Sequence, residues 1–297
     1  MKNDNKELPS GIRYIRKGDA EFPGKMLELH DCPKGIYVKG ALPDPAKKTV
    51  AIVGARMCSA YGRATASYFA RELAANDVQI ISGLALGIDS AAHNGALLSD
   101  GATFGVLAGG VDVCYPRANI ELYTKMCGKG GVISEETCGC PPIGRLFPKR
   151  NRIISVLSDI VLIVEARKRS GSLITADFAM EQGRDIFAIP GRLEDELSKG
   201  CNELICQGAG LAISPESLLE ILGKTNKKSD NSKKYVQNVL ASEENMVYSC
   251  LSLHPQGLEE LCKHTRLSIT AVIEAITLLQ LRGLVKEVGR NRYIKAS

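Results

Sequence analysis

Short apolar runs alternate with longer amphipathic segments through the first two thirds of the chain. The apolar runs lie at Val50–Val53, Val78–Ile81, Thr103–Leu107, Val132–Ser134, Ile160–Val164 and Ile186–Ile189. Apolar residues recur at helical spacing in Tyr61–Asp77, Ile88–Leu98 and Leu173–Gln182. Unbroken apolar strands that alternate with helices are typical of a parallel sheet covered on both faces. The pattern therefore predicts an α/β domain with a Rossmann-like, doubly wound and mostly parallel sheet.

The pattern changes near Gly223, where a stretch rich in Lys, Asn and Ser begins. Such a composition predicts a solvated linker. After it, helical patterns cover residues 243–253, 257–264 and 269–281, and a hairpin pattern covers residues 284–294. Ser268 stands where an N-cap of the third helix is expected. Three helices followed by a hairpin predict a small C-terminal winged helix domain.

These patterns divide the chain into four parts. We expect a short N-terminal extension over residues 1–40, the Rossmann-like domain over 41–222, a Lys-rich linker over 223–241 and the winged helix domain over 242–297.

Composition and charge narrow the classes of protein. Hydrophobic residues make up 44% and charged residues 24%, which excludes wholesale disorder and fibrous folds. The N-terminus is polar, and no apolar run approaches the roughly 18 residues of a membrane span. We therefore expect a cytoplasmic protein without a membrane span. Its ten cysteines, which lack the paired spacing of a zinc site, are expected to be reduced thiols that bind no metal.

Ligands of open α/β sheets bind at the carboxyl ends of the strands, so the residues after each strand carry the functional signal. Here these residues are Gly54-Ala55-Arg56, Ser82-Gly83, Gly109-Gly110 and the segment from Glu165 to Ser172. The chain has no G-x-x-x-x-G-K-[ST] sequence and no G-x-G-x-x-G after the first apolar run. The P-loop and dinucleotide-binding classes are therefore disfavoured, and no cofactor is expected.

Two basic segments follow strands of this sheet. Residues 167–169 are all cationic and precede Ser170-Gly171-Ser172 at the start of a helix. Ser170 is either a plain N-cap or part of a helix terminus that binds phosphate. The second segment, residues 145–152, holds four of the 38 cations in eight residues and is expected to be a loop before a short helix. It is either a solvated charge run or a surface for a nucleic-acid backbone, where Phe147 packs or stacks.

Candidates for catalysis are few. Asp89 and His93 are spaced four residues apart on one predicted helix, which suits an acid–base pair but also a local stabilising contact. Glu135 and Glu136 follow a strand without a nucleophile motif, and Glu165 could equally pair with a nearby cation. These residues form no catalytic set, so we do not predict an enzyme.

Several of these segments together resemble the DNA-processing protein A family (DprA/Smf) of bacteria. The resemblance rests on residues 51–56, 82–89, 109–112, 115–116, 147–154, 170–176, 190–191 and 200–205. It extends from about Glu21 to Leu222, with the motifs in the family's order. The C-terminal module resembles the winged helix that many members carry.

The resemblance implies a non-enzymatic protein that binds single-stranded DNA and loads RecA recombinase onto it during natural transformation. It also implies a homodimer formed through the sheet domain. Carried onto this sequence, the DNA-binding residues are Gly54, Arg56, Lys149, Arg150, Asn151 and Arg152, with Ser170, Gly171 and Ser172 as a phosphate seat. Apolar residues near Leu204, Ile205, Leu211 and Ile213 are candidates for the dimer face or for the core.

The sequence departs from the family pattern in three places. Leu86 stands where many members have a basic residue, and no SAM-type N-terminal domain is recognisable. Residues 269–281 contain no Lys or Arg but do contain Glu274, although a helix that reads a major groove normally presents cations and amides. We therefore expect the winged helix to contact protein, or to bind DNA weakly and without sequence preference.

Two other functions use a similar architecture. One is a nucleotide-processing enzyme of the lysine-decarboxylase-like phosphoribohydrolase type, which Gly109-Gly110 faintly suggests. That class needs a P-G-G-x-G-T-x-x-E type motif, whereas Val-Asp follows the two glycines here. The other is a winged-helix regulator with a ligand-sensing sheet domain, against which the uncharged third helix argues.

Overall fold

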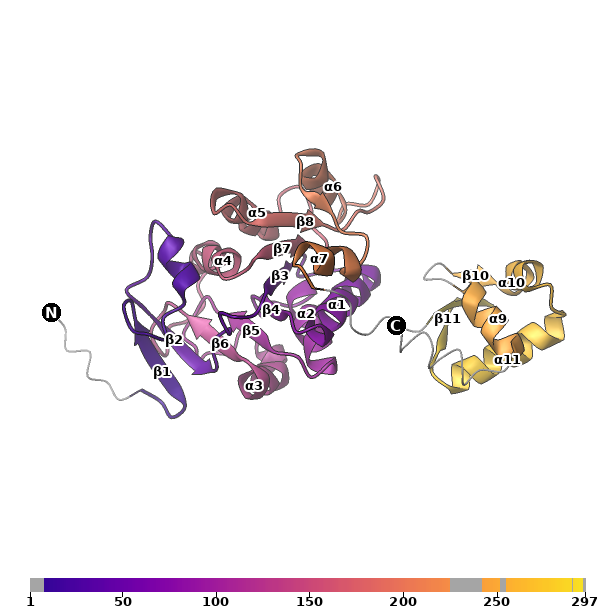
Figure 1. Cartoon of the computed structure of the whole chain (residues 1–297), viewed down its shortest axis with the longest axis horizontal. Coiled ribbons are helices and arrows are strands. Elements are labelled where there is room, and N and C mark those ends of the chain that lie inside the picture. The colour runs from indigo at the N-terminus through magenta and orange to yellow at the C-terminus, as the bar shows by residue number, and fades with distance from the viewer. Residues whose placement is uncertain (1–7, 225–241, 252–254, 290, 296–297) are drawn as a thin grey trace. The chain divides into compact units, whose positions relative to one another are not determined.

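The computed structural model describes residues 8–224, 242–251, 255–289 and 291–295 of the chain, which forms two compact units (Figure 1). The first unit comprises residues 1–226 and the second residues 227–297. Residues 225–241 of the predicted Lys-rich linker lie outside the described residues. Each unit is described by itself below.

A nine-stranded sheet forms the centre of the first unit. Its strands are β1 (Ile12–Arg16), β2 (Gly35–Gly40), β3 (Thr49–Val53), β4 (Gln79–Ser82), β5 (Thr103–Val106), β6 (Gly131–Ser134), β7 (Ile160–Ile163), β8 (Asp185–Ala188) and β9 (Gly210–Leu211). They are ordered β1-β2-β6-β5-β4-β3-β7-β8-β9. The strands from β6 to β9 in this order pair in parallel. This confirms the predicted Rossmann-like, mostly parallel sheet.

The predicted short N-terminal extension over residues 1–40 contributes two strands to the sheet. Strands β1 and β2 form an antiparallel pair, and β2 continues the sheet by pairing antiparallel with β6. Ile36 and Val38 of β2 are fully buried in the main core. Both strands place charged or aromatic residues between their buried apolar ones, so they lack the unbroken apolar run that marks the central strands.

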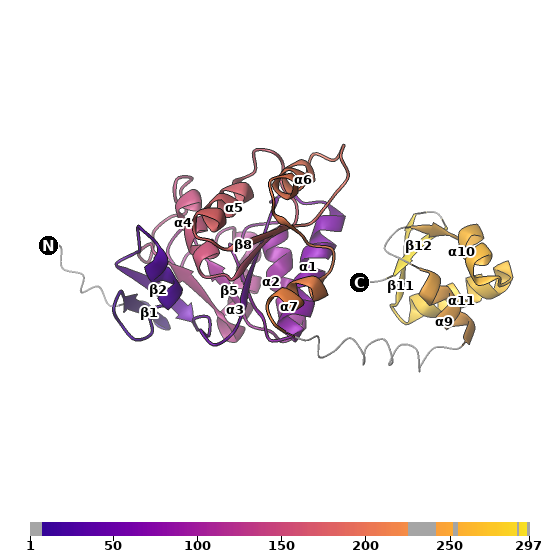
Figure 2. The ribbon, with the colours of Figure 1, turned by 45° about the horizontal axis from the view of Figure 1, so that its top comes forward.

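Helices cover both faces of the sheet (Figures 1 and 2). They are α1 (Ala60–Ala75), α2 (Ile88–Leu98), α3 (Ile120–Lys129), α4 (Leu146–Val156), α5 (Gly171–Glu181), α6 (Lys199–Cys206) and α7 (Pro215–Ile221), with short 3-10 turns η1 (Gly24–Glu28) and η2 (Arg117–Asn119). Successive residues of a strand point to opposite faces. Accordingly, Val50 and Ile52 of β3 pack with α1, α2 and α7, whereas Ala51 and Val53 pack with α4, α5 and α6.

Helix α4 begins earlier than the sequence suggested. The basic segment over residues 145–152 was expected to be a loop, but α4 starts at Leu146 and includes most of it. Pro148 lies in the first helical turn, where a missing N–H costs no intrahelical hydrogen bond. As a consequence, Arg150 and Arg152 belong to the same helix as Ile153 and are buried with it.

The second unit has the predicted winged helix architecture. It contains α9 (Ser242–Cys250), β10 (Gln256–Gly257), α10 (Leu258–Thr265), α11 (Ile269–Leu281), β11 (Val285–Gly289) and β12 (Arg292–Lys295). The strands form one sheet in the order β10-β12-β11. Ser268 caps α11 as predicted, because its Oγ accepts a hydrogen bond from the backbone N–H of Ala271 at 3.2 Å. Val272, Ile276 and Leu279 of α11 form the core with Leu261.

Among the residues that the structure describes, no helix is long and apolar enough to cross a membrane. Nor do the described residues include a group of three or more His, Cys, Asp or Glu side chains placed to hold a metal ion. All ten cysteines lie in the described parts of the chain and are free thiols.

Candidate nucleic-acid interface

The loops that follow β3, β4, β5 and β7 meet at one edge of the sheet, since these strands are parallel neighbours. The loop after β3 is held in place by its neighbours. The Ala55 N–H donates to the Glu165 carbonyl at 2.7 Å, and the Ile88 N–H donates to the Ala55 carbonyl at 3.2 Å. A Cβ on Gly54 would lie 2.7 Å from Cγ1 of Ile88, so only glycine fits this close approach. Gly54 therefore fixes the turn that presents Arg56.

Arg56 lies at the surface of this edge and is part of a small cation–aromatic cluster. Its guanidinium carbon lies 4.7 Å from the centre of the Phe147 ring. The Tyr115 ring meets Phe147 edge to face, with ring centres 6.0 Å apart, and Tyr115 is 49% exposed. Phe147 was predicted to pack or stack, whereas Tyr115 was only one of the residues that carry the family resemblance. The feature of the sequence that could have indicated Tyr115 is an aromatic residue in the segment that follows β5.

A shallow hollow of about 200 Å³ connects the loop after β3 with the loop after β7. It is lined by Ala55, Arg56, Met57, Arg167, Arg169, Ser170 and Leu197. Three of these residues are arginines and none is acidic. Arg56, Arg167 and Arg169 are all exposed. Outside the hollow, the pKa of Glu196 is lowered mainly by Lys199 and to a smaller extent by Arg167. This hollow therefore presents three exposed cations, and no acidic residue, at the carboxyl edge of the sheet.

Ser170 is the N-cap of α5, as the simpler interpretation of the sequence predicted. Its Oγ accepts a hydrogen bond from the Ser172 N–H at 3.4 Å and lies 2.8 Å from the Ser172 Oγ. Gly171 is exposed, and its carbonyl accepts a hydrogen bond from the Asn151 side-chain amide at 3.2 Å. Asn151 thus ties α4 to the start of α5. The helix terminus and the hollow share Ser170, so the predicted phosphate seat and the arginines form one surface.

Arg150 is buried beneath the edge, with 7% of its surface exposed. Its Nη1 donates hydrogen bonds to the carbonyls of Gly83, at 2.7 Å, and Val106. It therefore clamps α4 to the carboxyl ends of β4 and β5. A Cβ on Gly83 would lie 2.5 Å from this guanidinium, which explains why a glycine occupies this position.

Asp89 lies beside this clamp and is also buried. Its carboxylate accepts hydrogen bonds from the N–H groups of Gly83 and Ala85, at 3.2 and 3.3 Å. Burial raises the pKa of Asp89 and lowers that of Arg150 to about 10, and the attraction between the two charges opposes both shifts. At neutral pH Arg150 is therefore still a cation.

The other cations of α4 are paired with carboxylates. Arg152 is buried and forms ion pairs with Glu135 at 2.7 Å and with Asp31 at 2.9 Å. Lys149 lies between Glu135, at 3.3 Å, and Glu136, at 3.2 Å. Burial alone would lower the pKa of the Lys149 ammonium, but the two carboxylates more than offset this and raise it.

The nine residues predicted to bind DNA therefore separate into two groups. Arg56, Ser170 and Gly171 reach the surface around the hollow, and Ser172 lies just beneath it. Gly54, Arg150, Asn151 and Arg152 hold the loops and helices of the edge in position. Arg150 and Arg152 are buried: the Arg150 guanidinium donates to backbone carbonyls, and Nε and Nη2 of Arg152 pair with Asp31 and Glu135. Lys149 is exposed but paired.

The residues considered for catalysis have separate structural partners. His93 is fully buried, and its Nδ1 lies 2.6 Å from the Thr103 hydroxyl. Burial, with a contribution from Arg150, lowers its pKa to about 3. Glu165 accepts hydrogen bonds from the backbone N–H and the hydroxyl of Ser59 at the start of α1. These contacts favour structural roles for both residues.

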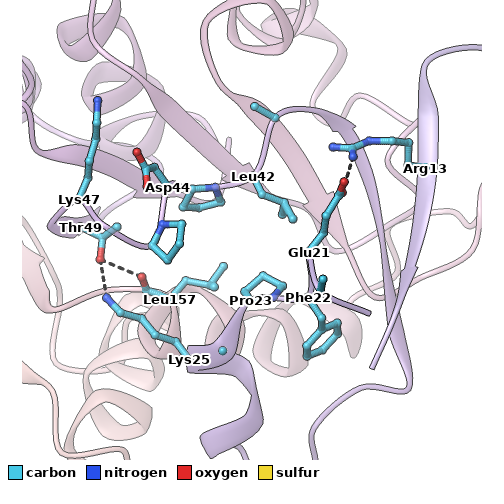
Figure 3. A pocket seen from close by; sticks show the side chains of 15 residues that line it. Arg13, Glu21, Phe22, Pro23, Lys25, Leu42, Asp44, Lys47, Thr49 and Leu157 are labelled. Atoms are coloured by element: carbon cyan, nitrogen blue, oxygen red, sulfur yellow. Dashed lines mark hydrogen bonds and ion pairs between the residues drawn. The ribbon is translucent and has the colours of Figure 1, made fainter. Parts of the chain in front are cut away.

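A larger cavity, of about 730 Å³, lies at the opposite edge of the sheet, near the start of β3 and the end of α4 (Figure 3). Its lining includes Phe22, Leu42, Leu157 and three prolines, together with the cations Arg13, Lys25 and Lys47. Each of these cations has a carboxylate partner, respectively Glu21, Asp159 and Asp77. This cavity therefore has less unpaired positive charge for an anion than the hollow at the carboxyl edge.

Comparison with known proteins agrees with this architecture. The family model described as DNA recombination-mediator protein A matches residues 13–223, and that of the DprA winged helix domain matches residues 235–289. Protein Smf of Escherichia coli is 44% identical over 211 residues, which cover 70% of this chain and 56% of that protein. DNA processing protein DprA of Streptococcus pneumoniae is 44% identical over 198 residues, 67% of this chain and 70% of that protein. The chain thus spans little more than half the length of the Escherichia coli relative.

Two solved structures share the fold of the first unit. The crystal structure of DprA from Streptococcus pneumoniae has a TM-score of 0.65 at 40% identity, covering 71% of this chain and 74% of that one. DNA processing protein A from Helicobacter pylori, a structure described for its single-stranded DNA binding mode, has a TM-score of 0.64 at 31% identity, covering 71% and 95%. With a family model matched over residues 13–223, this chain belongs to the DNA recombination-mediator protein A family.

Proposed function

We propose that the chain binds single-stranded DNA along the carboxyl edge of its sheet and loads RecA recombinase onto that DNA in natural transformation. The observation that carries the proposal is the hollow lined by Arg56, Arg167, Arg169 and Ser170, three cations and a helix N-cap without a carboxylate among the lining residues. Guanidinium groups and helix N-termini are favourable partners of phosphate. Membership of the recombination-mediator family and the similarity to the Helicobacter pylori protein support it.

In this proposal the phosphates lie over the hollow and the bases lie toward the aromatic cluster. Arg56, Arg167 and Arg169 neutralise phosphates, and the Ser170–Ser172 helix terminus accepts one of them. Phe147 and the exposed Tyr115 offer the ring surface on which a base stacks. Gly54, Arg150, Asn151 and Arg152 act as positioning residues that keep this surface in shape.

The winged helix receives a different role. Helix α11 exposes Ile269 and Ile273 and contains no Lys or Arg, so it lacks the cations with which a helix reads a major groove. We propose that this unit contacts protein or binds DNA weakly and without sequence preference.

DNA binding is tested with mixed-sequence oligonucleotides, single-stranded and duplex, at several salt concentrations. We expect a preference for single strands, and about tenfold weaker binding by Arg56→Ala at low salt, because one phosphate contact is lost. Lys47→Ala, which removes a cation at the opposite edge, is the matched control and should bind like the wild type. Equal binding of Arg56→Ala and wild type at every salt concentration would contradict the proposal.

The mediator role and the homodimer need their own tests. RecA filament growth on single strands coated with the protein should be accelerated, and an absence of stimulation would remove the mediator role. Among the apolar residues considered for a dimer face, Leu204 is buried in the core, whereas Leu211 and Ile213 at the β9 edge are 48% and 71% exposed. If that face pairs two copies, Ile213→Asp should shift the sedimentation coefficient from dimer to monomer.

The phosphoribohydrolase alternative gains no support from the glycine turn that suggested it. A Cβ on Gly109 would lie 2.7 Å from the Cys140 carbonyl, and one on Gly110 would lie 2.6 Å from the Thr137 carbonyl. The turn is thus packed against residues 137–140 of the same chain. Release of ribose 5-phosphate from a nucleoside monophosphate would nevertheless decide for the enzyme.

A further inference from the structure

We propose that Glu135 and Glu136 form an electrostatic boundary of the single-stranded DNA path: they hold Lys149 in ion pairs and keep phosphates away from the β6 end of the sheet edge. The inference rests on the proposed DNA-binding function and assigns specificity-determining residues to it. It also explains why the most cationic segment of the sequence does not make the most cationic surface.

The boundary is a compact group of five charged side chains. Lys149 Nζ lies 3.3 Å from Glu135 and 3.2 Å from Glu136, and Arg152 pairs with Glu135 and with Asp31. The group therefore contains two cations and three carboxylates, and Arg150 lines the same small hollow as Glu135, Glu136 and Lys149. The Lys149 side chain is 44% exposed, so its carboxylate partners, not burial, separate it from a phosphate. A phosphate that approached Lys149 would have to compete with both carboxylates for the ammonium group.

The contrast with the hollow follows the order of the strands. Glu135 and Glu136 follow β6, Arg56 follows β3 and Arg167 follows β7. Strands β5 and β4 separate β6 from β3 in the sheet, and β7 adjoins β3 on its other side. The edge thus changes from cations paired with carboxylates near the end of β6 to exposed arginines after β3 and β7. A phosphate chain bound at the hollow is attracted at one end of the edge and repelled at the other.

Alternatives for Lys149 lead to opposite outcomes. If Lys149 exchanged its carboxylate partners for phosphate on binding, its removal would weaken binding as much as the removal of Arg56. If the carboxylates exclude phosphate, the removal of Lys149 has little effect and the removal of a carboxylate strengthens binding. The structure favours the second outcome, because the ammonium has two carboxylate partners within 3.3 Å and a single phosphate would have to displace both.

The test is the binding of a mixed-sequence single-stranded oligonucleotide by Glu136→Gln at several salt concentrations. We expect about threefold to tenfold tighter binding at low salt, because a repulsive charge is removed and Lys149 becomes available. The slope of log K against log salt should steepen by about 0.7, the contribution of one additional phosphate contact. In the double variant Glu136→Gln/Lys149→Ala this steepening should disappear.

Asp77→Asn is the matched control. It removes one carboxylate from an ion-paired lysine, Lys47 at 2.8 Å, just before β4 and hence at the opposite edge of the sheet. Its left-handed backbone, with a φ of 62°, is one that Asn also adopts readily. It should bind DNA like the wild type. An equal gain in Asp77→Asn and Glu136→Gln would show a general effect of net charge and overturn the boundary.

The remaining outcomes separate this inference from the proposed function. If Arg56→Ala weakens binding but Glu136→Gln binds like the wild type, the DNA site stands and the boundary is wrong. If Lys149→Ala weakens binding as much as Arg56→Ala does, Lys149 is a phosphate contact and the boundary is again wrong. If the wild type shows no binding to single strands, the proposed function itself fails.

Discussion

Two groups of cations follow the strands of the same sheet, and the sequence marked both as candidates for DNA contact. The edge group consists of Arg56, Arg167 and Arg169, and the α4 group consists of Lys149, Arg150 and Arg152. The edge group is exposed around a hollow without an acidic lining residue. The α4 group is either buried or paired with carboxylates.

The comparison shows that the number of cations in a segment does not determine how much positive charge is accessible to a ligand. Among the three cations within four residues of α4, Lys149 and Arg152 are paired with carboxylates and Arg150 faces backbone carbonyls. The scattered edge group is poorer in sequence signal but richer in accessible charge. In this family member we therefore expect the α4 group to contribute to stability and the edge group to affinity.

The largest expected effect is the loss of stability in Arg150→Met. The substitution keeps much of the side chain's volume but leaves the Gly83 and Val106 carbonyls without their charged donor. Removal of a buried charged hydrogen-bond donor costs about 3 kcal/mol. Urea unfolding should show this as a lower midpoint of the transition.

The matched variant for this comparison is Arg56→Met, whose side chain is exposed. Its free energy of unfolding should change by less than about 1 kcal/mol, as is usual for surface positions. Equal destabilisation of the two variants would contradict the distinction between the α4 group and the edge group, because Arg150 would then contribute no more to stability than Arg56.

A second, smaller effect is expected in the pH dependence of stability. The pKa of His93 is lowered to about 3 by burial and by Arg150, whereas an unfolded chain protonates this imidazole below about pH 6.5. Between these values the unfolded state binds the additional proton, so stability falls as the pH falls, by about 1 kcal/mol per pH unit. Asp89, whose pKa is raised, acts in the opposite sense once it protonates.

His93→Gln should lose less stability than the wild type between pH 6.5 and about pH 4.5. Both proteins retain Asp89, so its contribution cancels in the difference between their urea midpoints. Parallel curves for the two proteins would mean that His93 is not held neutral by this buried cluster.

Much of the fold could be predicted because its signals are local. The central strands are buried on both faces and therefore appear as unbroken apolar runs, and Ser268 and Ser170 mark helix starts by their own chemistry. The strands β1 and β2 escaped prediction because they lack an unbroken apolar run and are recognisable mainly by their pairing, of β1 with β2 and of β2 with β6. The start of α4 was missed because Pro148 and the charges around it suggest a loop in isolation.

The site was predictable only in part, for a related reason. The position of Arg56 and Ser170 follows from the rule that strand ends gather at one edge. The burial of Arg152 depends on Asp31, which lies in another part of the chain, and that of Arg150 depends on carbonyls of β5 and of the loop after β4. No local pattern contains these partners, so the sequence could not separate accessible cations from paired ones.

The central claim is that the edge group, and not the α4 group, neutralises DNA phosphates. The most direct measurement is the slope of log K against log salt for one mixed-sequence single-stranded oligonucleotide bound by wild type, Arg56→Ala and Lys149→Ala. The slope for Arg56→Ala should be flatter than that of the wild type by about 0.7, and the slope for Lys149→Ala should be unchanged. A flatter slope for Lys149→Ala together with an unchanged slope for Arg56→Ala would contradict the account.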